Sequence, residues 1–364
     1  MKPKIAVILS GYGVVHRGAE TMLDELLPRL ADRFDLHVYS RSGRGPGGIR
    51  RAAVSRSVLE PLYLSSVTLR KGMDTLFVDP IHAEWTSHLL LSLPSLIRGR
   101  YQAIWHETGL WGGYILGALR RLTGVKLLDY AHSSHPGWEL PFARRRPDLL
   151  VTANPELAQT IRRQVPGLRV EVVPQGVDCQ HFRPDIEPWD LDVRRPVALM
   201  VGALSPEKRP DLAIDAAAMS GVSLVVAGSG PLASRVDHQA AELLGVDRYH
   251  RLEIERAQLP RLYNAADLVV LSSPLESGAL AALEALACGK PVVTAADPIR
   301  TEIIGDGGIL VEDQTPEAYA GAISKALAAQ WGDRPRQRAL AYSVDRQAQR
   351  FASLLGELTR ETSP

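Results

Sequence analysis

At 364 residues the chain exceeds what one hydrophobic core usually supports, and its 45% hydrophobic and 23% charged residues are typical of a globular α/β protein, so we expect two domains. No apolar run reaches the length of about 18 residues that suggests a membrane-spanning helix. The two cysteines, Cys179 and Cys288, are too few for a disulfide framework, which favours a reducing cytoplasm.

The net charge of +1 hides an asymmetry between the two halves of the chain. Residues 1–182 carry 23 Lys and Arg against 16 Asp and Glu, whereas the remainder carries 19 against 25. The basic half favours an anionic acceptor or peripheral contact with the anionic inner face of a membrane, with solvated surface arginines as the alternative. The basic residues are not interleaved with aromatic residues, so we expect no nucleic-acid partner.

Strands alternate with helices through the first half, which predicts a parallel, Rossmann-like sheet. The loop at 40–50 is rich in Gly, Arg and Ser, and we expect it to be mobile. The predicted strands are 4–9, 35–39, 75–79, 102–106, 126–132, 149–153 and 169–174, and the predicted helices are 19–31, 84–97, 112–122 and 155–164.

A second Rossmann-like half follows a segment with four prolines at 174–196. We predict a first domain at 1–182, a linker at 183–196, a second domain at 197–342 and a terminal helix within 343–364. The predicted strands of the second half are 197–204, 223–228, 249–254, 268–271 and one beginning at 292–293, and the predicted helices are 209–219, 231–244, 258–265 and 343–360.

Residues 269–293, reading VVLSSPLESGALAALEALACGKPVV, are the most informative stretch. A β-branched strand leads into a turn with Glu276, a helix carries Glu284, and a Cys-Gly-Lys-Pro turn leads into another strand. Ligands bind beyond the carboxyl ends of parallel strands, so the two carboxylates are placed to contact different parts of one elongated ligand. The alternative is a surface helix with two solvated acids.

This segment resembles the Glu-x7-Glu motif of family 4 retaining glycosyltransferases (glycosyl transferases group 1), which have the GT-B fold. The resemblance implies two Rossmann-like domains, a C-terminal helix crossing back to the first domain, and a UDP- or GDP-sugar donor. It implies that Glu276 contacts the donor sugar and that Glu284 holds the ribose. The residues after Glu276 also belong to the implied donor site, and they depart from the usual Glu-x-Phe-Gly, which leaves the sugar open: Gly278, Ala279 and Leu280.

Residues 201–216 resemble the family segment in which an Arg and a Lys neutralise the donor diphosphate. Lys208 matches the lysine, but Ala203 stands in the arginine position. A cation on the leaving diphosphate contributes to affinity and to transition-state stabilisation. We therefore expect Arg209, on the same loop, or Arg17 to replace the missing charge.

Three further segments match the implied donor site. AGSGP at 227–231 resembles the family's Gly-x-Gly-Pro loop, RLEIE at 251–255 begins the segment whose backbone contacts the base, and SGYGVVHRGAET at 10–21 resembles the glycine loop facing the phosphates. The residues implied are Gly228, Gly230, Pro231, Arg251, Leu252 and Gly18. The spacing Gly-x-Gly-x4-Gly in the last loop fits a dinucleotide fingerprint poorly, although Arg41 keeps NADP as a remote alternative.

In the first half, LLDYAHSSHPGWE at 127–139 places His132 at a strand end, where the family has a histidine near the reacting carbon of the donor sugar. His132-x2-His135 lacks a third metal ligand at convincing spacing, and Asp190-x-Asp192 lies in the predicted linker, so we expect neither a metal nor another cofactor. Core packing is the alternative for any single tryptophan. The acceptor-side candidates are His106, Trp111, His135 and Trp138.

The family's proposed mechanism needs no protein nucleophile. The acceptor oxygen attacks from the side of the departing diphosphate, whose oxygen takes the acceptor proton. The predicted catalytic residues are therefore His132, Lys208 and Glu276, with a saccharide, a lipid-linked sugar or a small molecule as acceptor. Two alternatives stay open: a GT-B nucleotide-sugar 2-epimerase, and a non-catalytic sugar-nucleotide-binding protein, which Ala203 motivates. The oligomeric state is not indicated.

Overall fold

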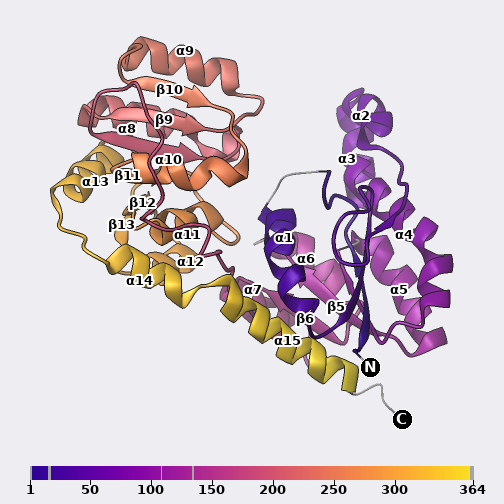
Figure 1. Ribbon diagram of the computed structural model, residues 1–364. Helices are drawn as coiled ribbons and strands as arrows, with labels where there is room; N and C mark the ends of the chain where they lie inside the picture. Colours follow the sequence, from indigo (N-terminus) through magenta and orange to yellow (C-terminus); the bar gives the residue numbers. More distant parts are fainter. Residues whose placement is uncertain (1, 15–17, 108, 133–134, 361–364) are drawn as a thin grey trace. The chain divides into compact units, whose positions relative to one another are not determined.

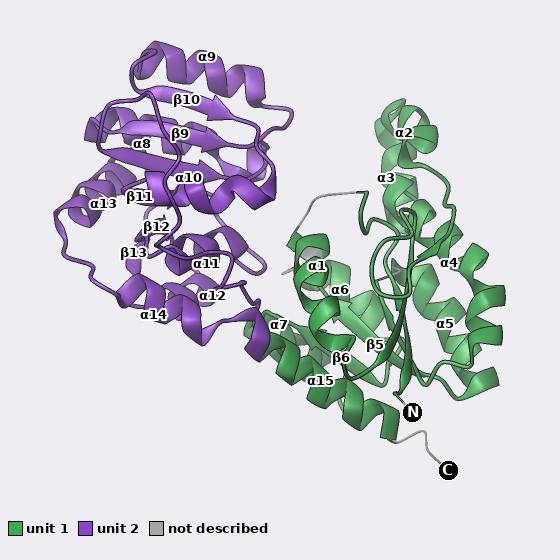
Figure 2. Ribbon diagram, viewed as in Figure 1, with its two compact units in different colours: residues 1–174, 347–364 green, residues 175–346 purple. Residues whose placement is uncertain are grey.

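The computed structural model describes residues 2–14, 18–107, 109–132 and 135–360. The chain forms two compact units, one of residues 1–174 and 347–364 and the other of residues 175–346 (Figure 2). The division falls before Gln175, earlier than the predicted domain end at 182, because Val177 bridges to Ser343 and Phe182 lies in the core of the second unit. The predicted linker also packs on that core, through Trp189, Leu191 and Val193.

The first unit is built on a seven-stranded parallel sheet with the order β3-β2-β1-β4-β5-β6-β7 (Figure 1). The strands are β1 Lys4–Ile8, β2 Asp35–Ser40, β3 Ile49–Arg50, β4 Ala103–His106, β5 Lys126–Ala131, β6 Leu149–Thr152 and β7 Val170–Val172. The helices are α1 Gly18–Leu30, α2 Arg56–Leu64, α3 Val67–Leu76, α4 Pro80–Gly99, α5 Gly109–Thr123, α6 Pro136–Ala143 and α7 Pro155–Gln164.

The strand predicted at 75–79 is wrong, because this segment ends α3 and begins α4. Phe77 adopts a left-handed conformation with φ 53° and ends α3. The Asp79 carboxylate accepts hydrogen bonds from the backbone N–H groups of Ile81 and His82, which caps α4. Helices α2, α3 and α6 had no counterpart among the predicted elements, and the loop predicted at 40–50 contains the short strand β3.

The C-terminal helix α15, Val344–Arg360, contributes to the core of the first unit from residue 347 onward. The Phe351 ring stacks on Trp105 with a centroid distance of 4.7 Å and an interplanar angle of 7°. Arg169 lies between two carboxylates, and its guanidinium pairs with Glu357 at 2.5 Å. The terminal helix is therefore part of the first unit's packing, as the GT-B resemblance implied.

The second unit is built on a six-stranded parallel sheet with the order β10-β9-β8-β11-β12-β13. Its strands are β8 Val197–Val201, β9 Ser223–Ala227, β10 Tyr249–Leu252, β11 Leu268–Leu271, β12 Val292–Ala295 and β13 Gly308–Val311. Its helices are η1 Pro206–Lys208, α8 Pro210–Ser220, α9 Ala233–Leu243, η2 Arg256–Gln258, α10 Leu259–Ala265, α11 Leu280–Ala287, α12 Pro298–Ile304, α13 Pro316–Ala328 and α14 Arg334–Ala341.

The strand order of the second unit reverses between β8 and β11. From β8 the chain proceeds outward to β9 and β10, and from β11 it proceeds the other way to β12 and β13. In sheets of this kind, ligands bind outside the carboxyl ends of the strands at the point of reversal. The loops that follow β8 and β11 are therefore the first place to look for a site.

Candidate functional site

The loops after β8 and β11 bring together Lys208 and Glu276, two of the side chains that were predicted to act on the donor. The ammonium of Lys208 donates to Oε1 of Glu276 at 2.6 Å. The Ser273 hydroxyl donates to the same oxygen at 2.5 Å. The neighbouring Ser272 hydroxyl bonds the carbonyls of Lys208 and Arg209, at 2.9 and 2.7 Å, which ties the two loops to each other.

A fully buried arginine supports the loop that carries Glu276. Arg300 is 0% exposed, and its guanidinium donates to the carbonyls of Ser273 at 2.7 Å and Pro274 at 2.8 Å. Its charge is balanced by Asp297 at 2.6 Å. The sequence analysis missed Arg300, because it lies on α12, outside the motif, and nothing in the sequence indicates that it turns back to this loop.

The turn between Glu276 and α11 is conformationally restricted. Ala279 has φ 48° and ψ 40°, a left-handed conformation that costs a residue with a Cβ about 1–2 kcal/mol. A Cβ on Gly278 would lie 3.3 Å from the Gln175 side chain. Leu280, the third residue predicted here, begins α11. This turn from Gly278 to Leu280 leads directly into the helix that carries Glu284.

The second carboxylate, Glu284, is buried, with 3% of its surface exposed. Arg256 donates to its Oε1 at 2.7 Å, and the Tyr263 hydroxyl donates to its Oε2 at 2.9 Å. Burial and the neighbouring Glu284 raise the pKa of Tyr263 well above its usual value, so this hydroxyl stays a donor. The surface-helix alternative with two solvated acids is wrong for Glu284, and the sequence analysis missed both of its partners.

The glycine loop after β9 approaches the loop after β8 closely. A Cβ on Gly228 would lie 1.9 Å from the carbonyl oxygen of Gly202, and Gly230, with φ 152°, would place one 2.5 Å from the carbonyl oxygen of Leu204. These contacts alone require glycine at both positions, whatever ligand binds there. Pro231 follows on the surface, in the loop between β9 and α9, and the contact of this loop with a donor remains a prediction.

The remaining donor-side candidates of the second unit have partners of their own. Arg251 pairs with Asp237 at 2.9 Å and with Glu253 at 2.6 Å. Leu252, beside it in β10, accepts a hydrogen bond from the Gly228 backbone at 3.0 Å and is partly buried. The strand end is thereby tied to the glycine loop.

The replacement of the missing arginine remains a prediction. Arg209 has φ 48° and pairs with Asp211 at 3.0 Å, and this hydrogen bond raises the pKa of the guanidinium. Ala203 is exposed at the start of the same loop. Arg17 lies outside the described residues. Gly18, the first residue of α1, is exposed, and a Cβ there would meet no atom within 4 Å.

In the first unit, the carboxyl ends of β4 and β5 carry a group of polar side chains, of which His106 and Asp129 are buried and His132 and Glu107 are partly exposed. His132 Nε2 lies 3.6 Å from Glu107, its ring packs on Tyr130 at 4.2 Å, and burial lowers its pKa to about 3. His106 Nδ1 lies 3.8 Å from Asp129. Burial lowers the pKa of His106 to about 4 and raises that of Asp129 to about 7, so the histidines are neutral at neutral pH.

Both tryptophans among the acceptor-side candidates are half exposed. Trp111 is 42% and Trp138 is 51% exposed, so neither is a core residue. His135 caps α6, because its Nδ1 accepts the N–H of Gly137 at 3.2 Å. Trp138 stacks over His82 with a centroid distance of 6.2 Å. The sequence analysis missed His82, whose Nδ1 pairs with Asp79.

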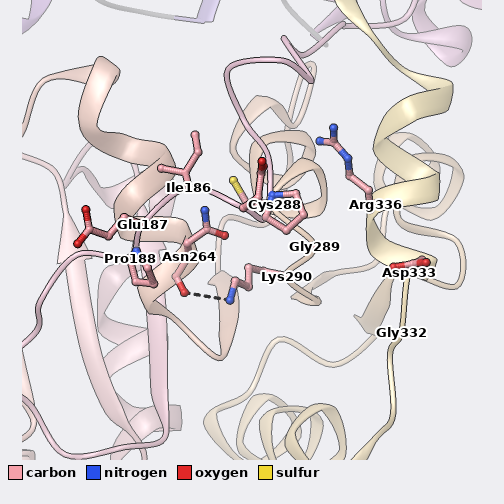
Figure 3. A pocket seen from close by; sticks show the side chains of 12 residues that line it. Ile186, Glu187, Pro188, Asn264, Cys288, Gly289, Lys290, Gly332, Asp333 and Arg336 are labelled. Carbon is pink, nitrogen blue, oxygen red and sulfur yellow. Dashed lines mark hydrogen bonds between the residues drawn. The ribbon is translucent and has the colours of Figure 1, made fainter.

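A cavity of about 420 Å³ lies near the amino ends of β11 and β12, where Asn264 and Lys290 precede the two strands (Figure 3). The Lys290 ammonium donates to the carbonyl of Asn264 at 3.0 Å, and Arg336 donates to three backbone carbonyls. The two cationic side chains that line the cavity, Lys290 and Arg336, are therefore engaged in contacts that stabilise the fold. Within the described residues, no group of three His, Cys, Asp or Glu side chains is placed to hold a metal ion.

Two family models cover most of the chain: Glycosyltransferase Family 4 over residues 16–181 and Glycosyl transferases group 1 over residues 182–344. The D-inositol 3-phosphate glycosyltransferase of Salinispora tropica is 36% identical over 215 residues, which is 50% of this chain and 43% of that protein. That of Mycobacteroides abscessus is 31% identical over 248 residues, 62% of this chain and 56% of that protein. The matched region thus spans about half the length of these relatives.

Solved structures share the fold at low sequence identity. A sucrose-phosphate synthase from Thermosynechococcus elongatus superimposes with a TM-score of 0.79 at 20% identity, over 99% of this chain and 100% of that one. HepE from Anabaena, in complex with UDP and glucose, superimposes with a TM-score of 0.70 at 17% identity, over 98% of this chain and 100% of that one. At these identities, the likeness establishes the two Rossmann-like domains.

Proposed function

The chain belongs to the family 4 glycosyltransferases, with a group 1 domain in its second half, and from this premise we propose that it transfers a sugar from a nucleotide-diphosphate donor to an acceptor. One observation carries the proposal. Lys208 and Glu276, which come from different loops, meet at 2.6 Å where the strand order of the second sheet reverses. This is the position at which parallel α/β sheets bind nucleotides.

Each charged group has a part of the donor to contact. Lys208 neutralises the diphosphate, Glu276 accepts hydrogen bonds from sugar hydroxyls, and Glu284 accepts them from the ribose. For Glu284 to do so, the ribose has to replace Arg256 or share its carboxylate, because the Tyr263 hydroxyl occupies the other oxygen. The buried carboxylate is then already oriented, which lowers the entropic cost of binding the diol.

The proposed reaction retains the anomeric configuration. The bond between the anomeric carbon and the acceptor oxygen forms on the face from which the bond to the diphosphate oxygen breaks, and the diphosphate takes the acceptor proton. Glu276 suits a role in orientation, because its Oε1 already accepts from Lys208 and Ser273, which weakens it as a nucleophile. Lys208 supplies the positive charge on the leaving group, so the proposal needs no metal.

The acceptor and the base are proposed only as classes. The solved HepE complex contains UDP and glucose, which makes UDP-sugars the first donors to test beside GDP-sugars. The curated relatives are named for D-inositol 3-phosphate, so phosphorylated polyols belong among the acceptors. The excess of Lys and Arg in residues 1–182 suits an anionic acceptor of this kind.

The experiment combines binding with turnover. We expect one nucleoside diphosphate and its sugar to raise the melting temperature, because a ligand of the folded state stabilises it. Release of nucleoside diphosphate should then require an acceptor. Release without an acceptor, together with an epimerised sugar, would identify a 2-epimerase. Ala203 favours one second candidate, a non-catalytic sugar-nucleotide-binding protein, which would show binding but no release with any acceptor.

A further inference from the structure

Helices α2 and α3 form a hairpin, residues 56–76, in which neither helix has a buried residue. Figure 1 shows α2 at the tip of its unit, beyond the sheet. Helices of 9 and 10 residues are marginal in water on their own, and α2 packs on α3 and α4 without burying any of its residues. The six large aliphatic side chains of the hairpin that are 38% to 68% exposed are Val58, Leu62, Leu64, Val67, Leu69 and Leu76.

The base of the hairpin is fixed to the first unit. Arg56 donates through Nε and Nη2 to the two carboxylate oxygens of Glu84, each at 3.2 Å, and Glu84 is 0% exposed. The Tyr63 hydroxyl donates to Asp74 at 2.9 Å, which links α2 to α3. The hairpin is therefore an anchored projection, and its aliphatic side chains are left outside the core.

The segment around the hairpin is strongly basic. The hairpin itself contains three Lys and Arg against two Asp and Glu, and the preceding residues 41–51 add four arginines, of which Arg41 pairs with the buried Glu84. Arg70 and Lys71 are exposed on α3 itself, next to Leu69. An exposed aliphatic surface bordered by cations has the chemistry of the boundary between acyl chains and anionic headgroups.

Aromatic side chains extend this surface from the end of the hairpin. The indole N–H of Trp111 donates to the carbonyl of Leu76 at 3.0 Å, and the Trp111 ring lies 5.9 Å from Tyr114. Both rings are half exposed, and the Arg145 guanidinium lies 4.3 Å from the centre of the Tyr114 ring. Tryptophan and tyrosine favour the membrane–water interface, because one part of each ring is apolar and the other forms hydrogen bonds.

We propose that the α2–α3 hairpin, with Trp111 and Tyr114, is a docking surface for an anionic lipid bilayer. A second copy of this chain is the less suitable occupant, since a self-complementary contact would bring together two surfaces that each carry Arg70 and Lys71 and lie next to the arginine-rich residues 41–51. None of the described helices is long and apolar enough to span a membrane. The proposal does not rest on glycosyl transfer.

Flotation with lipid vesicles tests the proposal. The protein should bind vesicles that contain phosphatidylglycerol and not vesicles of phosphatidylcholine alone, and added salt should weaken the binding. The double variant Leu62→Glu, Leu69→Glu should lose binding by about tenfold or more. Val246→Glu, at a residue of the second unit that is 85% exposed, is the matched control and should bind as the wild type does.

A fluorescent probe keeps the test independent of the folding of the charged variant. Cys179 and Cys288 are buried, so a dye sensitive to polarity can be attached to Val67→Cys. The dye should shift to the blue with anionic vesicles, whereas the same dye on Val246→Cys should not. Absence of wild-type binding, equal binding to neutral vesicles, or binding that survives both glutamates would overturn the proposal. A dimer in light scattering without vesicle binding would instead show a second copy as the cover.

Discussion

The ammonium nitrogen of Lys208 and Oε1 of Glu276 lie 2.6 Å apart, although 68 positions separate the two residues in sequence. Both side chains are partly exposed, so a ligand can reach them. The pair joins the residue proposed for the diphosphate to the residue proposed for the sugar. It also means that each group is already oriented by the other before a donor arrives.

Glu276→Gln should separate the two roles. The variant keeps the size of the side chain and removes the charge that pairs with Lys208, so the lysine becomes freer to bind phosphate. We expect turnover to fall by about 100-fold or more, because the neutral amide forms weaker hydrogen bonds than the carboxylate to the sugar in the transition state. Affinity for the free nucleoside diphosphate, measured by calorimetry, should stay the same or rise. An equal loss of affinity for the diphosphate and the sugar nucleotide would place Glu276 elsewhere.

Glu284→Ala should weaken nucleotide binding strongly. A ribose diol would lose a charged acceptor, which costs roughly 1.5–3 kcal/mol, or about 10- to 150-fold in affinity. Arg256→Met is the matched control, because it removes the group that competes with the ribose for the carboxylate and leaves Glu284 held by Tyr263. The control should bind nucleotide as tightly as the wild type or more tightly. Unchanged affinity in a folded Glu284→Ala variant would contradict the ribose assignment.

The missing family arginine gives a third prediction. If Arg209 has taken over the diphosphate charge, Arg209→Met should lower diphosphate affinity, and its effect with Lys208→Met should be less than additive, because both act on one leaving group. Ala203→Arg should then restore part of the loss. Should Arg209→Met and Arg17→Ala each leave turnover intact, the compensation hypothesis fails.

Arg300→Met tests whether the buried arginine positions Glu276. Removing its charge leaves the buried Asp297 without its partner and breaks the contacts to the carbonyls of Ser273 and Pro274, which should destabilise the fold by about 3–5 kcal/mol. In the folded protein at low temperature, kcat should fall more than KM rises. Arg336→Met removes another arginine that binds backbone carbonyls, on α14 beside the cavity of Figure 3, and should cost stability without a selective loss of kcat. Equal kinetics in the two variants would make Arg300 purely structural.

Acidification should destabilise the first unit. Burial lowers the pKa of His88 to about 4, so between this value and about 6.5 the unfolded chain binds a proton that the folded chain does not. His106 and His132 act in the same direction. Asp129 acts in the opposite direction, because its raised pKa means that the folded chain binds one proton that the unfolded chain does not. Stability is thus lost as pH falls through this window.

The His88→Gln variant isolates one of these contributions. The free energy of unfolding should be measured by denaturation at about pH 7 and at about pH 5. The loss of this free energy between the two pH values should be roughly 2 kcal/mol smaller in the variant than in the wild type. Identical losses in both proteins would mean that His88 does not carry the effect.

The fold was largely predictable because its strands are short β-branched runs between clear helix signals. The strand 268–271 and the helix 155–164 match the structure residue for residue. The segment 75–79 misled because Leu, Phe and Val suggested a strand, while Asp79 was in fact a helix cap. The residues after 174 read as a linker because of their prolines, although Val177 and Phe182 pack in the second unit.

The site could be predicted only for residues that belong to a recognisable sequence motif. The carboxylates Glu276 and Glu284 followed from one motif, and Lys208 from another. Arg256, which pairs with Glu284, and Arg300, which binds the backbone of the Glu276 loop, did not, because contacts between distant elements depend on how the sheet brings loops together. A single sequence contains no signal for such a pairing.

The most direct test is a calorimetric series of nucleoside, nucleoside diphosphate and nucleotide sugar, measured on the wild type and on Glu284→Ala, Lys208→Met and Glu276→Gln. The account predicts that Glu284→Ala weakens all three ligands, that Lys208→Met acts only once the diphosphate is present, and that Glu276→Gln weakens only the nucleotide sugar. If the wild type binds no member of any such series, or if the three variants lose the same affinity for every ligand, the donor site is not where these residues lie.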